Sequence, residues 1–199
     1  MIELVKNEIR VLEIQKFYIG LNWEFPIERK YFGGHSDVYE YTIDLVAFML
    51  GANKQLLSKD YFVFYNNLNS PDKALNHSDE YVFCECPEDY EFIFVDLTKI
   101  NPEVKEIIFA ISIYEAKDIH LKFGHFREGY IRLNQTLNCK LGQEEYRYYL
   151  SRDISSCSSV EVCRLFKCDG EWRFQTLEIG HVGNLVDLIT KFDRDGDYS

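Results

Sequence analysis

The sequence predicts a mainly β fold, namely a two-sheet β-sandwich with short helical turns and one C-terminal helix. Short runs of β-branched and aromatic residues recur along the 199 residues, and most are bounded by Gly, Asn, Asp, Pro or Ser. Runs of this length between turn residues are typical of strands in sandwiches. The hydrophobic content of 46%, with 16% aromatic residues, supplies enough apolar material to fill a core between two sheets.

The strand pattern, in which apolar and polar residues alternate or β-branched and aromatic residues cluster, recurs from the N-terminal third to residue 177. In chain order the predicted strands are residues 11–21, 41–50, 61–65, 92–97, 106–114, 129–134, 146–150, 159–167 and 171–177. Two hairpin turns are expected, one at residues 50–53 and one at residues 167–170. In the second, Asp169 and Gly170 suit the positive φ of a tight turn.

Two segments carry helical signals. Near the C-terminus, apolar residues stand at positions 185, 188, 189 and 192, which is helical spacing, so we expect a helix docked on the sandwich. Asn101 precedes Pro102 between two strands and is expected to cap a short helical turn. Because no repeat, low-complexity tract or linker interrupts the chain, we expect one domain over residues 1–192, followed by an acidic tail over residues 193–199.

Charge and composition limit the environment and the partners of the protein. The formal net charge of -11 argues against a nucleic acid or an anionic membrane as partner, since both repel an acidic surface. The first residues lack the pattern of a secretory signal, and no apolar run approaches the roughly 20 residues that span a bilayer. We therefore expect a cytoplasmic protein whose six irregularly spaced cysteines are reduced.

The segment of residues 61–91 carries the strongest candidate site. An aromatic strand there runs into Asn66 and Asn67, and a loop rich in Asp and Glu follows. Side-chain amides and carboxylates are the oxygen donors of hard cations such as calcium. Two alternatives stay open, because Asn66 and Asn67 also suit an Asx-type turn and because runs of charge on loops are commonly solvated.

Several blocks of the chain, taken in order, resemble the tellurium-resistance TerD-type stress-protein family. The resemblance extends from about residue 14 to residue 192, and His77 stands at the distance of the family's histidine. The blocks are Gly20-Leu21-Asn22-Trp23-Glu24, residues 62–68, Asp96-Leu97, Ile113-Tyr114-Glu115-Ala116, Phe123-Gly124, Ile131-Arg132, residues 170–174 and residues 180–185.

This resemblance implies a two-sheet sandwich that binds calcium through acidic loops at one end. It also implies a part without enzymatic activity in a stress-resistance system. In such a system the partners are other Ter-type proteins and a membrane-bound protein.

The family's metal-binding positions fall on residues of mixed suitability. Its Asp-x-Asp-x-Asp strand aligns with Glu40, Thr42 and Asp44, and its glycine-rich acidic loop aligns with residues 79–91, where the carboxylates remain and the glycines are replaced. Residues with a Cβ resist the positive φ that such a loop uses to turn carbonyl oxygens inward. One interpretation is a single calcium ion; the other is a relic site. The candidate ligands are Asp44, Asn66, Asn67, Glu80, Glu85, Asp89 and Glu91.

Other functions have weaker support in the sequence. The chain has no P-loop, no dinucleotide-binding fingerprint, no Gly-x-Ser-x-Gly and no His-Glu-x-x-His motif, so we expect no catalysis. Glu115 and Arg132 are expected to form a buried ion pair, and Trp23 and Trp172 to fill the core. The alternative function is a metal-free scaffold or a carbohydrate-binding sandwich, since sandwiches also host lectins.

Overall fold

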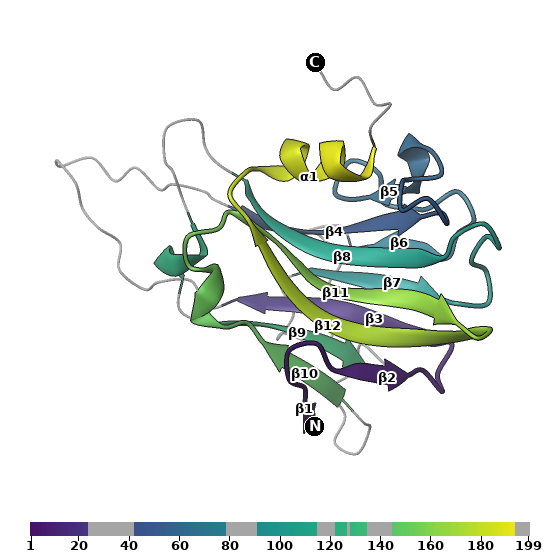
Figure 1. Cartoon of the computed structure of the whole chain (residues 1–199), viewed down its shortest axis with the longest axis horizontal. Coiled ribbons are helices and arrows are strands. Elements are labelled where there is room, and N and C mark those ends of the chain that lie inside the picture. The colour runs from purple at the N-terminus through teal and green to yellow at the C-terminus, as the bar shows by residue number, and fades with distance from the viewer. Residues whose placement is uncertain (24–41, 79–90, 115–121, 127, 135–144, 194–199) are drawn as a thin grey trace, which may run out of the picture.

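Two six-stranded sheets face each other in the computed structural model, which describes residues 1–23, 42–78, 91–114, 122–126, 128–134 and 145–193. Sheet A has the strand order β1-β10-β9-β3-β7-β6, and sheet B has the order β2-β12-β11-β8-β4-β5. Figure 1 shows the two layers, with the N-terminus beside β1 and β10. The predicted two-sheet β-sandwich is confirmed.

Neighbouring strands are antiparallel except for β1 and β10, which run parallel. Sheet A comprises β1 (Ile2–Glu3), β3 (Lys16–Trp23), β6 (Leu75–His77), β7 (Glu91–Asp96), β9 (Gly129–Asn134) and β10 (Glu145–Tyr149). Sheet B comprises β2 (Ile9–Val11), β4 (Thr42–Leu50), β5 (Phe62–Val63), β8 (Glu106–Tyr114), β11 (Ser159–Cys168) and β12 (Glu171–His181). Three short 3-10 turns and one helix complete the described elements: η1 (Lys59–Tyr61), η2 (Phe123–His125), η3 (Arg152–Ile154) and α1 (Leu185–Phe192).

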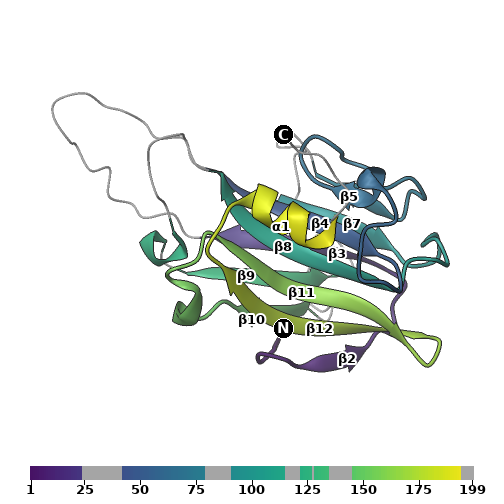
Figure 2. The same cartoon turned by 45° about the horizontal axis from the view of Figure 1, so that its top comes forward.

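Sheet B is apolar on both faces. On β4, Ile43, Leu45, Ala47 and Met49 belong to the core between the sheets, whereas Val46, Phe48 and Leu50 belong to a second cluster on the outer face. Leu188, Ile189 and Phe192 of α1 complete the second cluster. Figure 2 shows α1 lying across this outer face, next to β4 and β8. Burial on both faces explains why residues 45–50 form a continuous apolar run.

The helix α1 begins at a complete capping box. Asn184 Oδ1 accepts hydrogen bonds from the Val186 and Asp187 N–H groups at 2.9 and 3.3 Å, and Asp187 Oδ2 accepts the Asn184 N–H at 2.8 Å. Because an eight-residue helix is marginal by itself, its packing on sheet B supplies most of its stability. The predicted C-terminal helix is confirmed. Within the described chain, no helix combines the length and hydrophobicity needed to span a membrane.

The local predictions had mixed outcomes. The turn between β11 and β12 is confirmed, with φ of 53° at Asp169 and 85° at Gly170. The single strand predicted over residues 11–21 is wrong: β2 and β3 lie in different sheets, because the chain crosses the sandwich between them. The strand predicted over residues 61–65 is reduced to β5, and η1 precedes it. The strand β6 was not predicted.

Candidate functional site

The candidate site lies at the end of the sandwich where β3 ends and β4 and β7 begin. Figure 1 shows these ends of β3, β4 and β7 on the same side of the sandwich. The candidate ligands Glu80, Glu85 and Asp89 fall in the segment 79–90 and therefore lie outside the described residues. Asp44, Asn66, Asn67 and Glu91 lie within them, so their surroundings can be stated.

The carboxylate of Glu91 joins the two sheets. Its position on β7 has the same parity as Ile93 and Val95, so its side chain points into the space between the sheets. Glu91 Oε2 accepts a hydrogen bond of 2.6 Å from the backbone N–H of Leu45 on β4. A candidate metal ligand from sheet A is thus already bonded to sheet B.

Beside Glu91, the buried His77 side chain meets two acceptors. Its Nε2 lies 2.8 Å from the carbonyl oxygen of Leu45 and 3.6 Å from Glu91 Oε2, and its Nδ1 lies against the carbonyl oxygen of Ser78. A neutral imidazole has one N–H and satisfies only one carbonyl, so this arrangement favours the doubly protonated imidazolium. Burial alone would lower the pKa of His77, but Glu91 and the two carbonyl oxygens outweigh burial and raise that pKa.

Asp44 lies on the other face of sheet B. It has the parity of Val46 and Phe48 on β4, so its side chain points to the outer face and not toward Glu91. Asp44 stands opposite Ser112 of β8, and Ser112 stands opposite Ser159 of β11. Asp44 is 7% exposed and Ser112 only 1%. Ser112 Oγ has no hydrogen-bond partner among the described residues.

The two asparagines form a local turn. The backbone groups of Phe64 and Asn67 bond to each other at 2.9 and 3.1 Å, which places Tyr65 and Asn66 at the tip of a tight turn. Asn67 Nδ2 donates to the carbonyl oxygens of Asp60 and Phe62 at 3.0 and 2.7 Å. The structural interpretation of Asn67 as a turn residue is confirmed, and its amide nitrogen is occupied in this role.

The described residues therefore divide the candidate ligands among three places: the space between the sheets, the outer face of sheet B and the turn after β5. Among them, no group of three His, Cys, Asp or Glu side chains comes together as a metal site. Ser112 was missed in the sequence. The signal was present, since it is the single hydroxyl within the apolar run of residues 107–113.

Away from this end, further buried carboxylates are bonded to neighbouring side chains. Glu178, at a bulge with φ of 83°, accepts from Tyr148 Oη, Ser151 Oγ and, at 2.9 Å, the Ser151 N–H. Burial and Glu178 raise the pKa of Tyr148 well above its ordinary value. Burial likewise raises the pKa of the Cys163 thiol, which keeps it protonated at neutral pH. These groups stabilise the fold and offer no activated nucleophile.

Glu161 ties α1 to sheet B. Its Oε1 accepts from His181 Nε2 at 2.7 Å and from Lys191 Nζ, the latter on the last turn of α1. Burial raises the pKa of Glu161, but the hydrogen bonds and charges of His181 and Lys191 outweigh burial, so the pKa lies below its ordinary value of 4.5.

We expect this contact to make stability depend on pH in acid. Because the folded pKa is depressed, the contribution of Glu161 is complete above pH 4.5 and is lost as pH falls through the folded pKa. In Glu161→Gln, the slope of unfolding free energy against pH should be shallower there, by up to about 1.4 kcal/mol per pH unit. Urea unfolding at several pH values between pH 6 and pH 3 measures this slope. The exposed Glu171→Gln is the control, and an equal slope change in both variants contradicts the assignment.

Comparison with known proteins agrees with the blocks found in the sequence. The family model of the TerD domain matches residues 2–192. The tellurium resistance protein TerD of Serratia marcescens is 29% identical, covering 87% of this chain and 85% of that protein. General stress protein 16U of Bacillus subtilis is 27% identical, covering 90% and 88%. A solved homologue of the telluride resistance protein from Streptomyces coelicolor matches the fold with a TM-score of 0.63 at 16% identity, covering 88% and 95%. This chain belongs to the TerD domain family.

Proposed function

We propose that the protein is a cytoplasmic interaction module of a stress-resistance system, which binds calcium at the end of the sandwich and has no enzymatic activity. The partners would be other Ter-type proteins and a membrane-bound protein, and nucleic acid is not expected beside a chain of net charge -11. The names of the relatives, which record tellurium resistance and general stress, support the role.

The observation that carries the metal part is the unpartnered hydroxyl of Ser112 beside the buried carboxylate of Asp44. Residues opposite each other in antiparallel strands have Cβ atoms about 5 Å apart, so both side chains can face one cation. A buried hydroxyl without a partner costs about 1–3 kcal/mol, which a cation contact would offset. Oxygen donors of this kind fit calcium.

The remaining ligands would come from the acidic segment and the neighbouring turn. Calcium, when bound, would supply a point of positive charge that joins carboxylates from separate segments. Asp44 and Ser112 would contact the ion from the outer face of sheet B, and Glu91, on the inner side of β4, would hold that strand in place through the N–H of Leu45. The residues proposed to complete the set are Asn66, Asn67, Glu80, Glu85 and Asp89.

A metal-free scaffold is the second candidate. It is favoured by the hydrogen bonds that already engage Glu91 Oε2 and the amide nitrogen of Asn67. In that case the acidic segment is a solvated surface, and the partner binds without a cation. Calcium then leaves the stability of the protein unchanged.

Calcium at about ten times its dissociation constant is expected to raise the melting temperature by about 3–5 °C, because a ligand of the folded state stabilises it by mass action. Differential scanning calorimetry in calcium, magnesium and EDTA measures the shift. Asp44→Asn should abolish it, whereas Asp60→Asn, an equal charge change at an exposed residue of η1, should keep it.

Ser112→Ala separates the two candidates. Without metal it should stabilise the protein by about 1 kcal/mol, because it removes a buried hydroxyl that lacks a partner. The rise in melting temperature that calcium causes should be smaller in Ser112→Ala than in the parent protein. If Ser112→Ala keeps the whole calcium response, or if the parent protein shows none, the metal part of the proposal is wrong and the scaffold remains.

A further inference from the structure

The two sides of the sandwich differ in how their edge strands are protected. On the side of β5 and β6, the edges are sealed: Phe62 O accepts from Asn67 Nδ2, and the β4 groups beyond β5 are bonded to His77 and Glu91. On β6, the N–H groups of Leu75 and His77 bond to Ser70 Oγ and Leu68 O. Sealing of this kind prevents an added strand.

The edge of β2, on the other side of sheet B, has no such cover. Backbone bonds join Leu12 to Trp172 and Glu8 to Thr176 at 3.1 Å, so residues 8, 10 and 12 turn their main-chain groups toward β12. The direction alternates along an antiparallel strand, so the N–H and C=O groups of Ile9 and Val11 point away from β12. Within the described chain, no hydrogen bond to these four groups is found.

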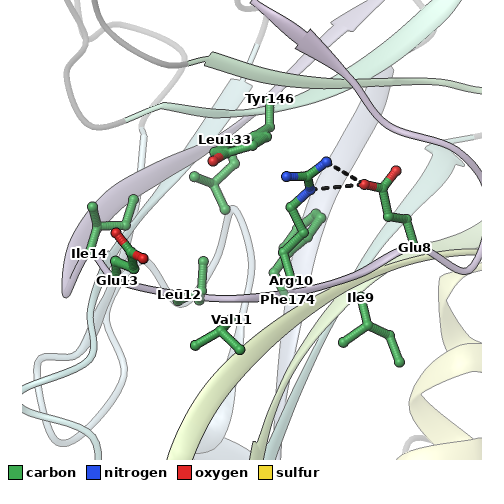
Figure 3. A pocket seen from close by; sticks show the side chains of 10 residues that line it. All are labelled: Glu8, Ile9, Arg10, Val11, Leu12, Glu13, Ile14, Leu133, Tyr146 and Phe174. Carbon is green, nitrogen blue, oxygen red and sulfur yellow. Dashed lines mark hydrogen bonds and ion pairs between the residues drawn. The ribbon is translucent and has the colours of Figure 1, made fainter.

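A cavity of about 660 Å³ lies beside this open edge. Figure 3 shows Arg10 reaching toward Tyr146 of β10, with Phe174 and Leu133 nearby, while Ile9 and Val11 point the opposite way. The cavity is lined by seven consecutive residues, 8–14, from one edge. The strand residues 9–11 extend over roughly 10 Å at about 3.3 Å per residue, so this slot beside β2 suits a short extended chain.

The chemistry of the slot indicates its occupant. Ile9 and Val11 are 51% and 53% exposed and offer apolar surface along the edge, whereas Leu133 and Phe174 on the wall of the cavity are almost fully buried. Arg10 is neutralised by two hydrogen bonds to Glu8 Oε1 at 2.6 and 2.8 Å. The exposed carboxylate of Glu13 forms no ion pair with another described residue. It leaves the slot with one net negative charge, on a chain of net charge -11.

We propose that the open edge of β2 binds an extended segment of a partner protein as an added strand, with alternating apolar residues and a basic residue that meets Glu13. Main-chain bonds to Ile9 and Val11 would supply the affinity, the apolar side chains of the segment would pack beside the exposed side chains of Ile9 and Val11, and its polar side chains would face the cavity. This site is distinct from the calcium end and does not depend on calcium.

A capped heptapeptide, Lys-Val-Thr-Val-Thr-Val-Lys, is the probe, because either strand direction places a lysine near Glu13. In EDTA, amide hydrogen exchange followed by NMR should show fast exchange at Ile9 and Val11 and slow exchange at Arg10 and Leu12. Saturating peptide should slow Ile9 and Val11 by about tenfold or more. The same peptide with N-methyl groups on its pairing edge should not slow the exchange of these two amides. The peptide with Glu in place of Lys should not slow it either.

Glu13→Lys should weaken binding of the peptide about fivefold. The matched control is Glu103→Lys, which makes the same charge change on an exposed turn between β7 and β8 and should bind as the parent does. The proposal is overturned if the amides of Ile9 and Val11 stay unprotected, or if the N-methylated peptide binds equally well. It is also overturned if both amides are already protected at high protein concentration, since a second copy then occupies the edge. The outcome of this peptide-binding test does not depend on whether the protein responds to calcium.

Discussion

Replacing His77 by alanine is expected to lower the free energy of unfolding by about 3–4 kcal/mol, the lower part of the range for breaking a buried ion pair. The imidazolium is buried, and it bonds to the carbonyl oxygens of Leu45 and Ser78 while facing Glu91. Its removal leaves two carbonyl oxygens without their donor and the Glu91 carboxylate without its counter-charge. For a chain of this size, the melting temperature should fall by roughly 6–16 °C.

A double-mutant cycle with Glu91→Ala tests the pair itself. Each single variant leaves an unpaired partner, so the double variant should cost less than the sum of the two by about 1–3 kcal/mol. Urea unfolding in EDTA provides the four free energies. His125→Ala, at an exposed histidine of η2, is the control and should cost about 1 kcal/mol or less. Additive costs for His77 and Glu91 would contradict the pairing.

The charge state of His77 has a direct spectroscopic readout. Nitrogen-15 NMR should show both ring nitrogens protonated near pH 7, because both face acceptor oxygens and Glu91 raises the pKa. Glu91→Gln keeps an acceptor for the Leu45 N–H but removes the charge, so it should lower the pKa of His77. A neutral His77 in the parent protein would contradict the assignment.

The sequence predicted those features whose cause is local. The spacing of Leu185, Leu188, Ile189 and Phe192 fixed α1, and Asp169 with Gly170 fixed the turn between the longest strands. The two-sheet fold followed from the number and composition of the runs. Features that depend on residues far apart in the sequence could not be predicted from it. Residues 11–21 read as one strand, because nothing in the run shows that β2 pairs with β12, some 160 residues away.

The candidate site shows the same division. His77 was recognised by its place in a family block, but its cationic state depends on Leu45, which is 32 residues away, and on Glu91. Asp44 and Glu91 were taken together because they align with the family's acidic metal-binding strand and loop. The alternation of side chains along β4 and β7 places Asp44 on the outer face of sheet B and Glu91 in the space between the sheets. This alternation could be assigned to faces only once the two apolar clusters were known. Ser112 entered the site through its pairing with Asp44.

Gly129→Ala is the second substitution with a large expected effect. Gly129 of β9 pairs with Trp23 of β3, and a Cβ on it would lie 2.3 Å from Trp23 Cε3. The indole cannot move aside easily, because it packs against Phe123 and Phe126 with ring centroids 5.1 and 5.6 Å away. Overpacking of this kind costs about 1–3 kcal/mol, and we expect the upper part of that range.

The clash with one ring makes the result specific. In a Trp23→Leu background, Gly129→Ala should cost less than about 1 kcal/mol, because the smaller side chain leaves room for the methyl group. Fluorescence in a Trp172→Phe background reports on Trp23 alone, and Gly129→Ala should shift its emission as the ring is displaced. Since β3 ends at Trp23, at the candidate calcium end of the sandwich, the same variant should also weaken the calcium response. An equal cost of Gly129→Ala with and without the indole would show that the backbone of β9, and not the ring, demands glycine.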